Sequence, residues 1–352
     1  MIARLLFLVP YRLVIPESET FTIFTYEDRG YGVAVYPPQK SDRPTTPDTP
    51  EEIRVDGVRA IDADVIRIDF LKSSFDRRDG LFCDPPFDVI RDAIASFITR
   101  IRHATRAAHI RPFNEFPIGT WRITYLNDDG SELEKAEGFV RLRGALRFSY
   151  SFTAVNRAVW AGIHDLPPDY QPPPWEELLL DAQADLPRIG PAIVLAATAL
   201  EVFITRKLDE LAKLKEVPQE LWTWINDRGT YLREPTIEEQ YDVLLRFLTG
   251  HSLKTEALWE SFQNLKSARN SFVHEGVAKL GGAPVSVEVA EKWVTAARDV
   301  ISKVREWLPP ELHWPLFNFH VNMEIQHRIP SGAPRSHTTT HAPEGPPQVG
   351  PS

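Results

Sequence analysis

Three residues near one another in the chain, Arg269, Asn270 and His274, combine a permanent cation, an amide and an acid/base group. A histidine can exchange a proton near neutral pH, and an arginine can neutralise the charge of a phosphate oxygen. The segment from Lys254 to His274 has apolar residues at spacings of three and four, which predicts an amphipathic helix. Together these groups could transfer protons and stabilise charge at a phosphate.

Arg269 falls within the apolar stripe of this predicted helix. An unpaired guanidinium in a protein interior is heavily penalised, so the side chain needs a partner. The predicted helix from Pro191 to Lys215 supplies one, because Glu201 lies in the middle of its own apolar stripe. We therefore expect Glu201 and Arg269 to face each other across two packed helices. The two stripes consist of Leu258, Phe262, Leu265 and Phe272 on one helix and Val194, Ala197, Ile204 and Leu208 on the other.

A second, polar stripe runs beside the apolar one on the later helix and carries Gln263, Lys266, Asn270 and His274. Arg269 and His274 are five positions apart in the sequence, which places their side chains about 140° apart on a regular helix. They converge only if the helix changes near His274 or if a second copy supplies the other group. Arg269 is thus either catalytic or a structural ion-pair partner.

The string Ala268-Arg-Asn-Ser-Phe-Val-His-Glu-Gly276, at the end of an amphipathic helix, resembles the Arg-x4-His signature of HEPN domains. The string Ala196-Ala-Thr-Ala-Leu-Glu-Val-Phe203 resembles the Glu-bearing first long helix of the ApeA-like branch of that superfamily. The resemblance covers about residues 175–308. It implies a homodimer through the helical domain that cuts RNA without a metal ion, with two motifs lining one cleft, and a role in defence against phage.

The resemblance also implies roles for individual residues. His274 would be the general acid or base at the 2'-hydroxyl or the leaving 5'-oxygen, and Arg269 would neutralise transition-state charge. Asn270 would orient the phosphate or His274, and Glu201 would position Arg269. Lys266 is a candidate phosphate contact. The alternative function is a HEPN bundle without nuclease activity, which serves as a dimerisation or nucleotide- or RNA-binding module.

The elements that must position these residues indicate an α+β chain of two domains. Up to about residue 165 the apolar period is two, which predicts an antiparallel β-rich accessory or sensor domain. One helix, from about Phe87 to Ala108, interrupts it. The predicted strands are centred on Phe21–Thr25, Ile66–Phe70, Trp121–Tyr125 and Leu146–Phe152, with a further strand at the N-terminus.

A proline-rich linker is predicted at residues 166–174, because its prolines remove backbone donors. A helical bundle follows over residues 175–310, then a strand within residues 311–328 that returns to the N-terminal sheet. Residues 329–352, with His337 and His341, have the composition of a disordered tail. The predicted helices of the bundle are Trp175–Ala184, Pro191–Lys215, Thr236–Leu248, Lys254–His274 and Val287–Leu308.

The charge of the chain limits how it can contact RNA. The net charge of -9 excludes a broadly basic surface, so any RNA contact must be focal. The basic cluster of Arg100, Arg102 and Arg106 either complements a helix C-terminus or forms an RNA groove. Tryptophans 222, 224 and 259 are expected in the core or at a dimer contact.

The one cysteine, Cys83, cannot form an internal disulfide, which fits a cytoplasmic protein. No metal-ligand pattern or cofactor motif is present, so no metal or cofactor is expected. We also expect no membrane contact, because no apolar stretch approaches the length of a span, about 18 residues.

Overall fold

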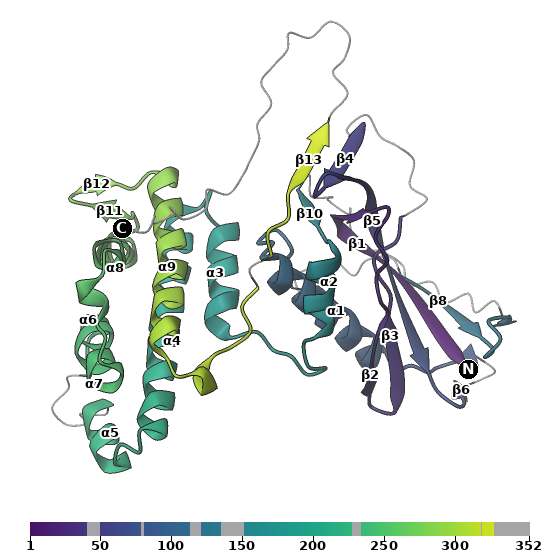
Figure 1. The fold of residues 1–352 in the computed structure, drawn as a ribbon, viewed down its shortest axis with the longest axis horizontal. Helices are drawn as coiled ribbons and strands as arrows, with labels where there is room; N and C mark the ends of the chain where they lie inside the picture. Colours follow the sequence, from purple (N-terminus) through teal and green to yellow (C-terminus); the bar gives the residue numbers. More distant parts are fainter. Residues whose placement is uncertain are drawn as a thin grey trace, which may run out of the picture. The chain divides into compact units, whose positions relative to one another are not determined.

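The computed structural model describes residues 1–40, 50–78, 81–112, 121–134, 151–226, 234–317 and 319–326. The chain divides into two compact units, which we name the N-terminal unit (Met1–Tyr170 and Phe317–Ser352) and the helical unit (Gln171–Leu316). The first boundary falls inside the segment predicted as a linker. The N-terminal region is built on an antiparallel sheet and the C-terminal region is helical, as Figure 1 shows.

The sheet of the N-terminal unit is organised around a long strand, β1 (Ile2–Pro16). It pairs antiparallel with β5 (Val58–Leu71) on one side and β8 (Trp121–Leu126) on the other. Alternate residues of β1 are buried, which explains the two-residue period of the sequence. The sheet also contains β2 (Phe24–Asp28), β3 (Tyr31–Val35), β4 (Glu52–Val55), β9 (Glu132–Glu134), β10 (Phe152–Ala154) and β13 (Met323–Gln326), and a separate ribbon pairs β6 (Arg77–Arg78) with β7 (Leu81–Phe82).

Two strand predictions differ from the structure. The predicted strand at Leu146–Phe152 lies largely outside the described residues; β10 begins at its last residue and pairs parallel to β1. The segment Phe21–Thr25 joins the sheet only from Phe24.

The N-terminal unit contains a second helix that the sequence analysis missed. The predicted helix is α1 (Phe87–Thr105), whose apolar side packs against the sheet in one core. The second is α2 (Arg157–His164), which begins where the Asn156 side chain accepts a hydrogen bond from the Val159 backbone N–H at 3.0 Å. With only eight residues, α2 is too short for a clear helical period in the sequence.

The helical unit is built around α4 (Ile189–Leu214), which packs against α3 (Pro174–Ala184), α8 (Leu258–Glu275) and α9 (Val287–Trp307). Three predictions needed correction. Helix α5 (Gln219–Asn226) was missed; the predicted helix at Thr236–Leu248 consists of α6 (Ile237–Glu239), a π-helix (Gln240–Leu244) and α7 (Leu245–Thr249); and α8 begins at Leu258, after a 3-10 turn (Leu253–Thr255).

A short hairpin, also missed, connects α8 to α9. It pairs β11 (Lys279–Leu280) with β12 (Ala283–Pro284) around Gly281 and Gly282. Both glycines have positive φ, the backbone conformation of a type I' turn, so this Gly-Gly pair was readable in the sequence.

The chain returns to the N-terminal unit after α9, but the strand is shorter than predicted. A 3-10 turn (Pro310–Leu312) follows α9, Phe317 is buried in the core of the N-terminal unit, and β13 alone pairs antiparallel with β4.

The expectation that no apolar segment approaches the length of a membrane span is wrong. By length and composition α4 could cross a membrane, with a mean hydropathy of 1.6 over an 18-residue window. Half of that window is buried inside the protein. Helix α4 packs against α3, α8 and α9 and also contacts α7, as the central helix of a bundle does.

Candidate functional site

The Arg269–His274 motif occupies the last turns of α8. Phe262, Leu265 and Ala268 are buried and hold this helix in the core of the helical unit. The helix ends at Gly276, where φ is 75° and the backbone N–H donates to the carbonyl of Phe272 at 2.8 Å. A left-handed backbone conformation favours glycine, so the helix ends at Gly276, the last residue of the motif string.

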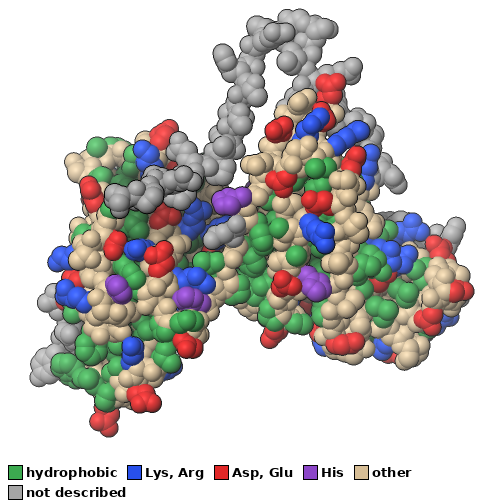
Figure 2. All heavy atoms as spheres, in the orientation of Figure 1, with side chains coloured by type: hydrophobic (Ala, Val, Ile, Leu, Met, Phe, Trp, Pro, Cys, Tyr) green, Lys and Arg blue, Asp and Glu red, His purple; other side chains and the backbone are tan. Residues whose placement is uncertain are grey.

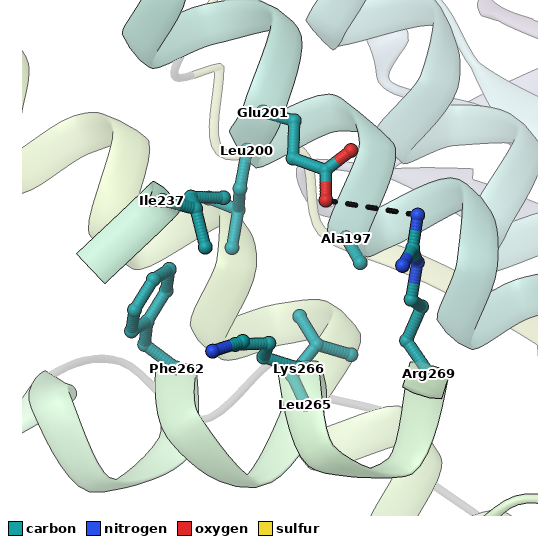
Figure 3. A pocket seen from close by; sticks show the side chains of 8 residues that line it. All are labelled: Ala197, Leu200, Glu201, Ile237, Phe262, Leu265, Lys266 and Arg269. Carbon is teal, nitrogen blue, oxygen red and sulfur yellow. Dashed lines mark ion pairs between the residues drawn. The ribbon is translucent and has the colours of Figure 1, made fainter. Parts of the chain in front are cut away.

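Glu201 and Arg269 face each other between α4 and α8, as predicted (Figure 3). Their Oε1 and Nη2 atoms are 3.9 Å apart. The predicted burial of the pair is wrong, because the two side chains are 41% and 33% exposed. Both sit at the solvent edge of the helix interface, where their polar ends remain accessible.

The guanidinium of Arg269 is only partly engaged. Its Nη1 donates to Asn270 Oδ1 at 3.1 Å, so Asn270 contacts the arginine. Its Nε atom is buried and has no hydrogen-bond partner among the described residues. The 3.9 Å separation from Glu201 is too long for a hydrogen bond. Nη2 of Arg269 is therefore free to donate a hydrogen bond to an anion, whereas the buried Nε is out of reach of one.

His274 is exposed on the last turn of α8. Its imidazole makes no hydrogen bond or ion pair within the part of the chain that the structure describes. Helix α8 continues without a break through this region, so the angular offset from Arg269 persists. A single chain does not bring Arg269 and His274 together.

Two residues inside the motif make specific contacts that the sequence did not reveal. Ser271 Oγ donates to the carbonyl of Val277 at 2.7 Å and accepts from the backbone N–H of Lys279 at 2.7 Å, which ties the β11–β12 hairpin to α8. The ring of Phe272 lies against Gly190 at the start of α4. Ser271 thus connects α8 to the hairpin that follows it, and Phe272 connects α8 to α4.

Lys266, on the same polar stripe, is paired with Glu238 of α6. Partial burial lowers the pKa of Lys266. Glu238 was not singled out from the sequence, although Thr236 and Glu239 form a capping box that marks the start of a helix there. The capping box would have predicted that Glu238 lies in the first turn of that helix.

Lys266 and Arg269 border a small hollow that is partly open to solvent (Figure 3). The space inside it is about that of one water molecule. The hollow is therefore too small to enclose a phosphate group or a nucleotide. The other lining residues are Ala197, Leu200, Glu201, Ile237, Phe262 and Leu265.

The basic cluster on α1 does not form an RNA groove. Arg100 and Arg102 are buried. Arg100 Nη1 donates to the carbonyls of Ile163 and Leu166, at 3.1 and 3.0 Å, and Arg106 caps the helix in a left-handed conformation. The prediction of Arg100 and Arg102 as RNA contacts is corrected, since both side chains are buried and the donors of Arg100 serve carbonyls inside the N-terminal unit.

The tryptophans divide between core and surface. Trp222 is buried and donates to Asp209 at 2.8 Å, and Trp259 stacks on Phe262. Trp224 is exposed. Figure 2 shows Lys and Arg interspersed with Asp and Glu on the visible face of the helical unit, without a broad basic region. Any contact with RNA on this face would therefore be focal.

Neither protein-family models, curated proteins nor solved structures gave a match to this chain. The functional argument therefore rests on the residues of the site.

Proposed function

We propose that this protein is a metal-independent endoribonuclease of HEPN type. The observation that carries the proposal is the pair of available groups on α8: an exposed imidazole at His274 and a partly exposed guanidinium at Arg269 whose Nη2 lies 3.9 Å from Glu201, too far for a hydrogen bond. His274 transfers a proton at the 2'-hydroxyl or at the leaving 5'-oxygen, and Arg269 neutralises charge on the phosphate. Asn270 holds the guanidinium through its amide oxygen.

The active form is a homodimer through the helical unit. On a regular helix the side chains of Arg269 and His274 point in different directions. In a dimer, the His274 of one protomer can face the Arg269 of its partner. Exposed apolar side chains beside His274 support this arrangement: Val273 is 54% exposed and Val277 is 44% exposed. Burial of these two side chains in an interface would add to the stability of such a dimer.

The N-terminal unit would be an accessory or sensor domain, and the biological role would be defence against phage. A cytoplasmic location fits both RNA as the substrate and the single free cysteine, Cys83.

The decisive experiment incubates purified protein with mixed RNA in EDTA, beside a His274→Ala variant. The wild type should cut RNA and leave 2',3'-cyclic phosphate ends, because the 2'-hydroxyl is the nucleophile. The variant should be slower by roughly 10²–10⁴-fold. Its fold should be intact, since an exposed side chain leaves no core cavity. Cleavage that stops in EDTA would contradict the proposal.

The contacts of Arg269 favour a second candidate. A guanidinium that faces Glu201 and bonds to Asn270 also suits a structural pair in a non-catalytic dimerisation or RNA-binding module. Wild-type protein that binds RNA without cutting it, and that His274→Ala leaves unchanged, would favour this module.

A further inference from the structure

The two segments that connect the units meet at one place in the helical unit. The first connection, residues 171–174, ends at Trp175 of α3, and the second, residues 315 and 316, begins after Trp314. The two indole rings are in contact, with centroids 5.3 Å apart and planes at 79°. Segments that are far apart in the chain are therefore held at a single cluster.

Helix α4 supplies the other two side chains of this cluster. The ring of Phe203 lies edge-on to both indoles, 5.3 Å from Trp175 and 5.6 Å from Trp314. Lys207, one turn further along α4, places Nζ 5.3 Å from the centre of the Trp175 ring and 5.2 Å from that of Trp314. All four side chains are buried, and such ring pairs and cation–π contacts are attractive. We name these four residues the clasp.

Trp314 also contacts the two helices on either side of the clasp. Its Nε1 donates to Glu176 of α3 at 3.3 Å, and its carbonyl oxygen accepts from Arg305 of α9 at 3.2 Å. Lys207 donates to the carbonyl of Leu312 at 3.0 Å, which holds the segment just before Trp314. Trp314 can therefore leave its position only if contacts to α3, α4 and α9 break together.

Both connections are short. Tyr170 and Phe317, the residues at their other ends, are buried in the core of the N-terminal unit. Residues 172–174 and 315 are prolines, which restrict the backbone. The connections thus have little slack, and a displacement of Tyr170 or Phe317 would act on the clasp.

We propose that the clasp opens as one unit, so that loss of the Trp314 contacts releases the start of α3 as well as residues 308–316. The clasp lies on α4, the helix that also carries Glu201 of the candidate site. A displacement within the N-terminal unit would reach α4 through it. This inference does not depend on the proposed nuclease activity.

Hydrogen exchange of the full-length protein, followed by mass spectrometry, measures the opening of both segments. The structure supplies one bonded reporter amide in each. The backbone N–H of Glu176 donates to the carbonyl of Pro173 at 2.9 Å, and that of His313 donates to the carbonyl of Pro310 at 3.1 Å. Exchange of such amides requires that the local structure opens.

Trp314→Leu removes two ring contacts and the indole N–H. We expect exchange to become about tenfold faster in the peptides that contain Glu176 and His313, because edge-to-face ring contacts are lost on both sides. Trp314→Phe keeps a ring and loses the N–H, so it should accelerate exchange at both reporters by a smaller factor. If Trp314→Leu does not fold, Trp314→Phe decides the question by the same comparison.

Trp293→Leu is the matched control. It removes a buried indole from the same core, at a point on α9 about 18 Å along the helix from Arg305. It should lower the free energy of unfolding in urea and leave both reporters close to their wild-type exchange rates. Circular dichroism checks that each variant is folded.

The inference is overturned if the Trp314 variants accelerate exchange at His313 but not at Glu176, because the two connections would then be held independently. Acceleration at neither reporter would overturn it as well. So would a Trp293→Leu variant that accelerates both reporters as much as Trp314→Leu, since that result would reflect a general loss of stability.

Discussion

The ring of Phe272 packs so closely on Gly190 that a Cβ atom at residue 190 would lie 2.0 Å from the ring's Cε2. This contact joins the motif on α8 to the first turn of α4. It explains why a glycine is placed inside a helix, where it is usually less favourable than alanine. The position of α8, and hence of Arg269 and His274, depends on this close approach.

Gly190→Ala should destabilise the helical unit. Alanine would normally gain up to about 1 kcal/mol in a helix, but overpacking typically costs about 1–3 kcal/mol, so the steric term should dominate. Urea unfolding measures the difference. Phe272→Leu in the same chain should recover part of the loss, and a Gly190→Ala variant more stable than the wild type would show that the ring moves aside freely.

Glu201→Ala should cost little stability, about 0–1 kcal/mol. The 3.9 Å separation and the 33% and 41% exposures make the pair a surface ion pair rather than a buried one. The sequence alone predicted burial, for which the loss would be about 3–5 kcal/mol. A loss of that size in urea unfolding would indicate that the pair is desolvated in solution.

Val273→Asp should weaken self-association and lower the rate of RNA cleavage, because it places a charge on the exposed apolar surface beside His274. Analytical ultracentrifugation and cleavage rates over a dilution series measure both effects. Val243→Asp is the control, since Val243 is 48% exposed on the π-helix. Equal effects of the two variants, or none for Val273→Asp, would contradict a dimer through the motif.

The N-terminal unit should lose stability as the pH falls from about 6.5 to 4.5. Burial, with Arg102 and Arg106 nearby, lowers the pKa of His103 to about 3, against about 6.5 in an unfolded chain. In this window the unfolded chain takes up the proton and the folded one does not, so stability rises with pH by up to about 1.4 kcal/mol per unit.

His103→Gln should reduce that slope in urea titrations at several pH values. His164→Gln is the control, because the His164 side chain is 46% exposed. A slope that His103→Gln leaves unchanged would show that the ring is protonated in the folded protein.

The sequence predicted the elements of the site better than their burial. Apolar spacing located α4 and α8 and placed Glu201 opposite Arg269, because both patterns extend over several turns. It could not distinguish a core position from the edge of an interface, where Arg269 and Glu201 lie. The arginine occupies a gap in the stripe that the packing leaves open to solvent.

Contacts between distant segments account for other errors. Arg100 is buried because carbonyls more than sixty residues later, at Ile163 and Leu166, accept its hydrogen bonds. No local sequence pattern predicts a hydrogen-bond partner that is so distant in the chain. Ser271 likewise looks like an ordinary polar helix residue until the hairpin folds back onto it.

The return of the chain to the N-terminal unit affects what a protease can separate. A cut in the proline-rich segment would leave Phe317 and β13 on the C-terminal fragment. Phe317, however, is part of the core of the N-terminal unit, and β13 pairs with β4 through backbone hydrogen bonds. The two fragments should therefore co-purify after nicking and come apart only in denaturant. Expression of residues 1–170 alone should yield a unit with an unfilled core position and an unpaired β4 edge, so a soluble version would need residues 317–326 grafted back or supplied as a peptide.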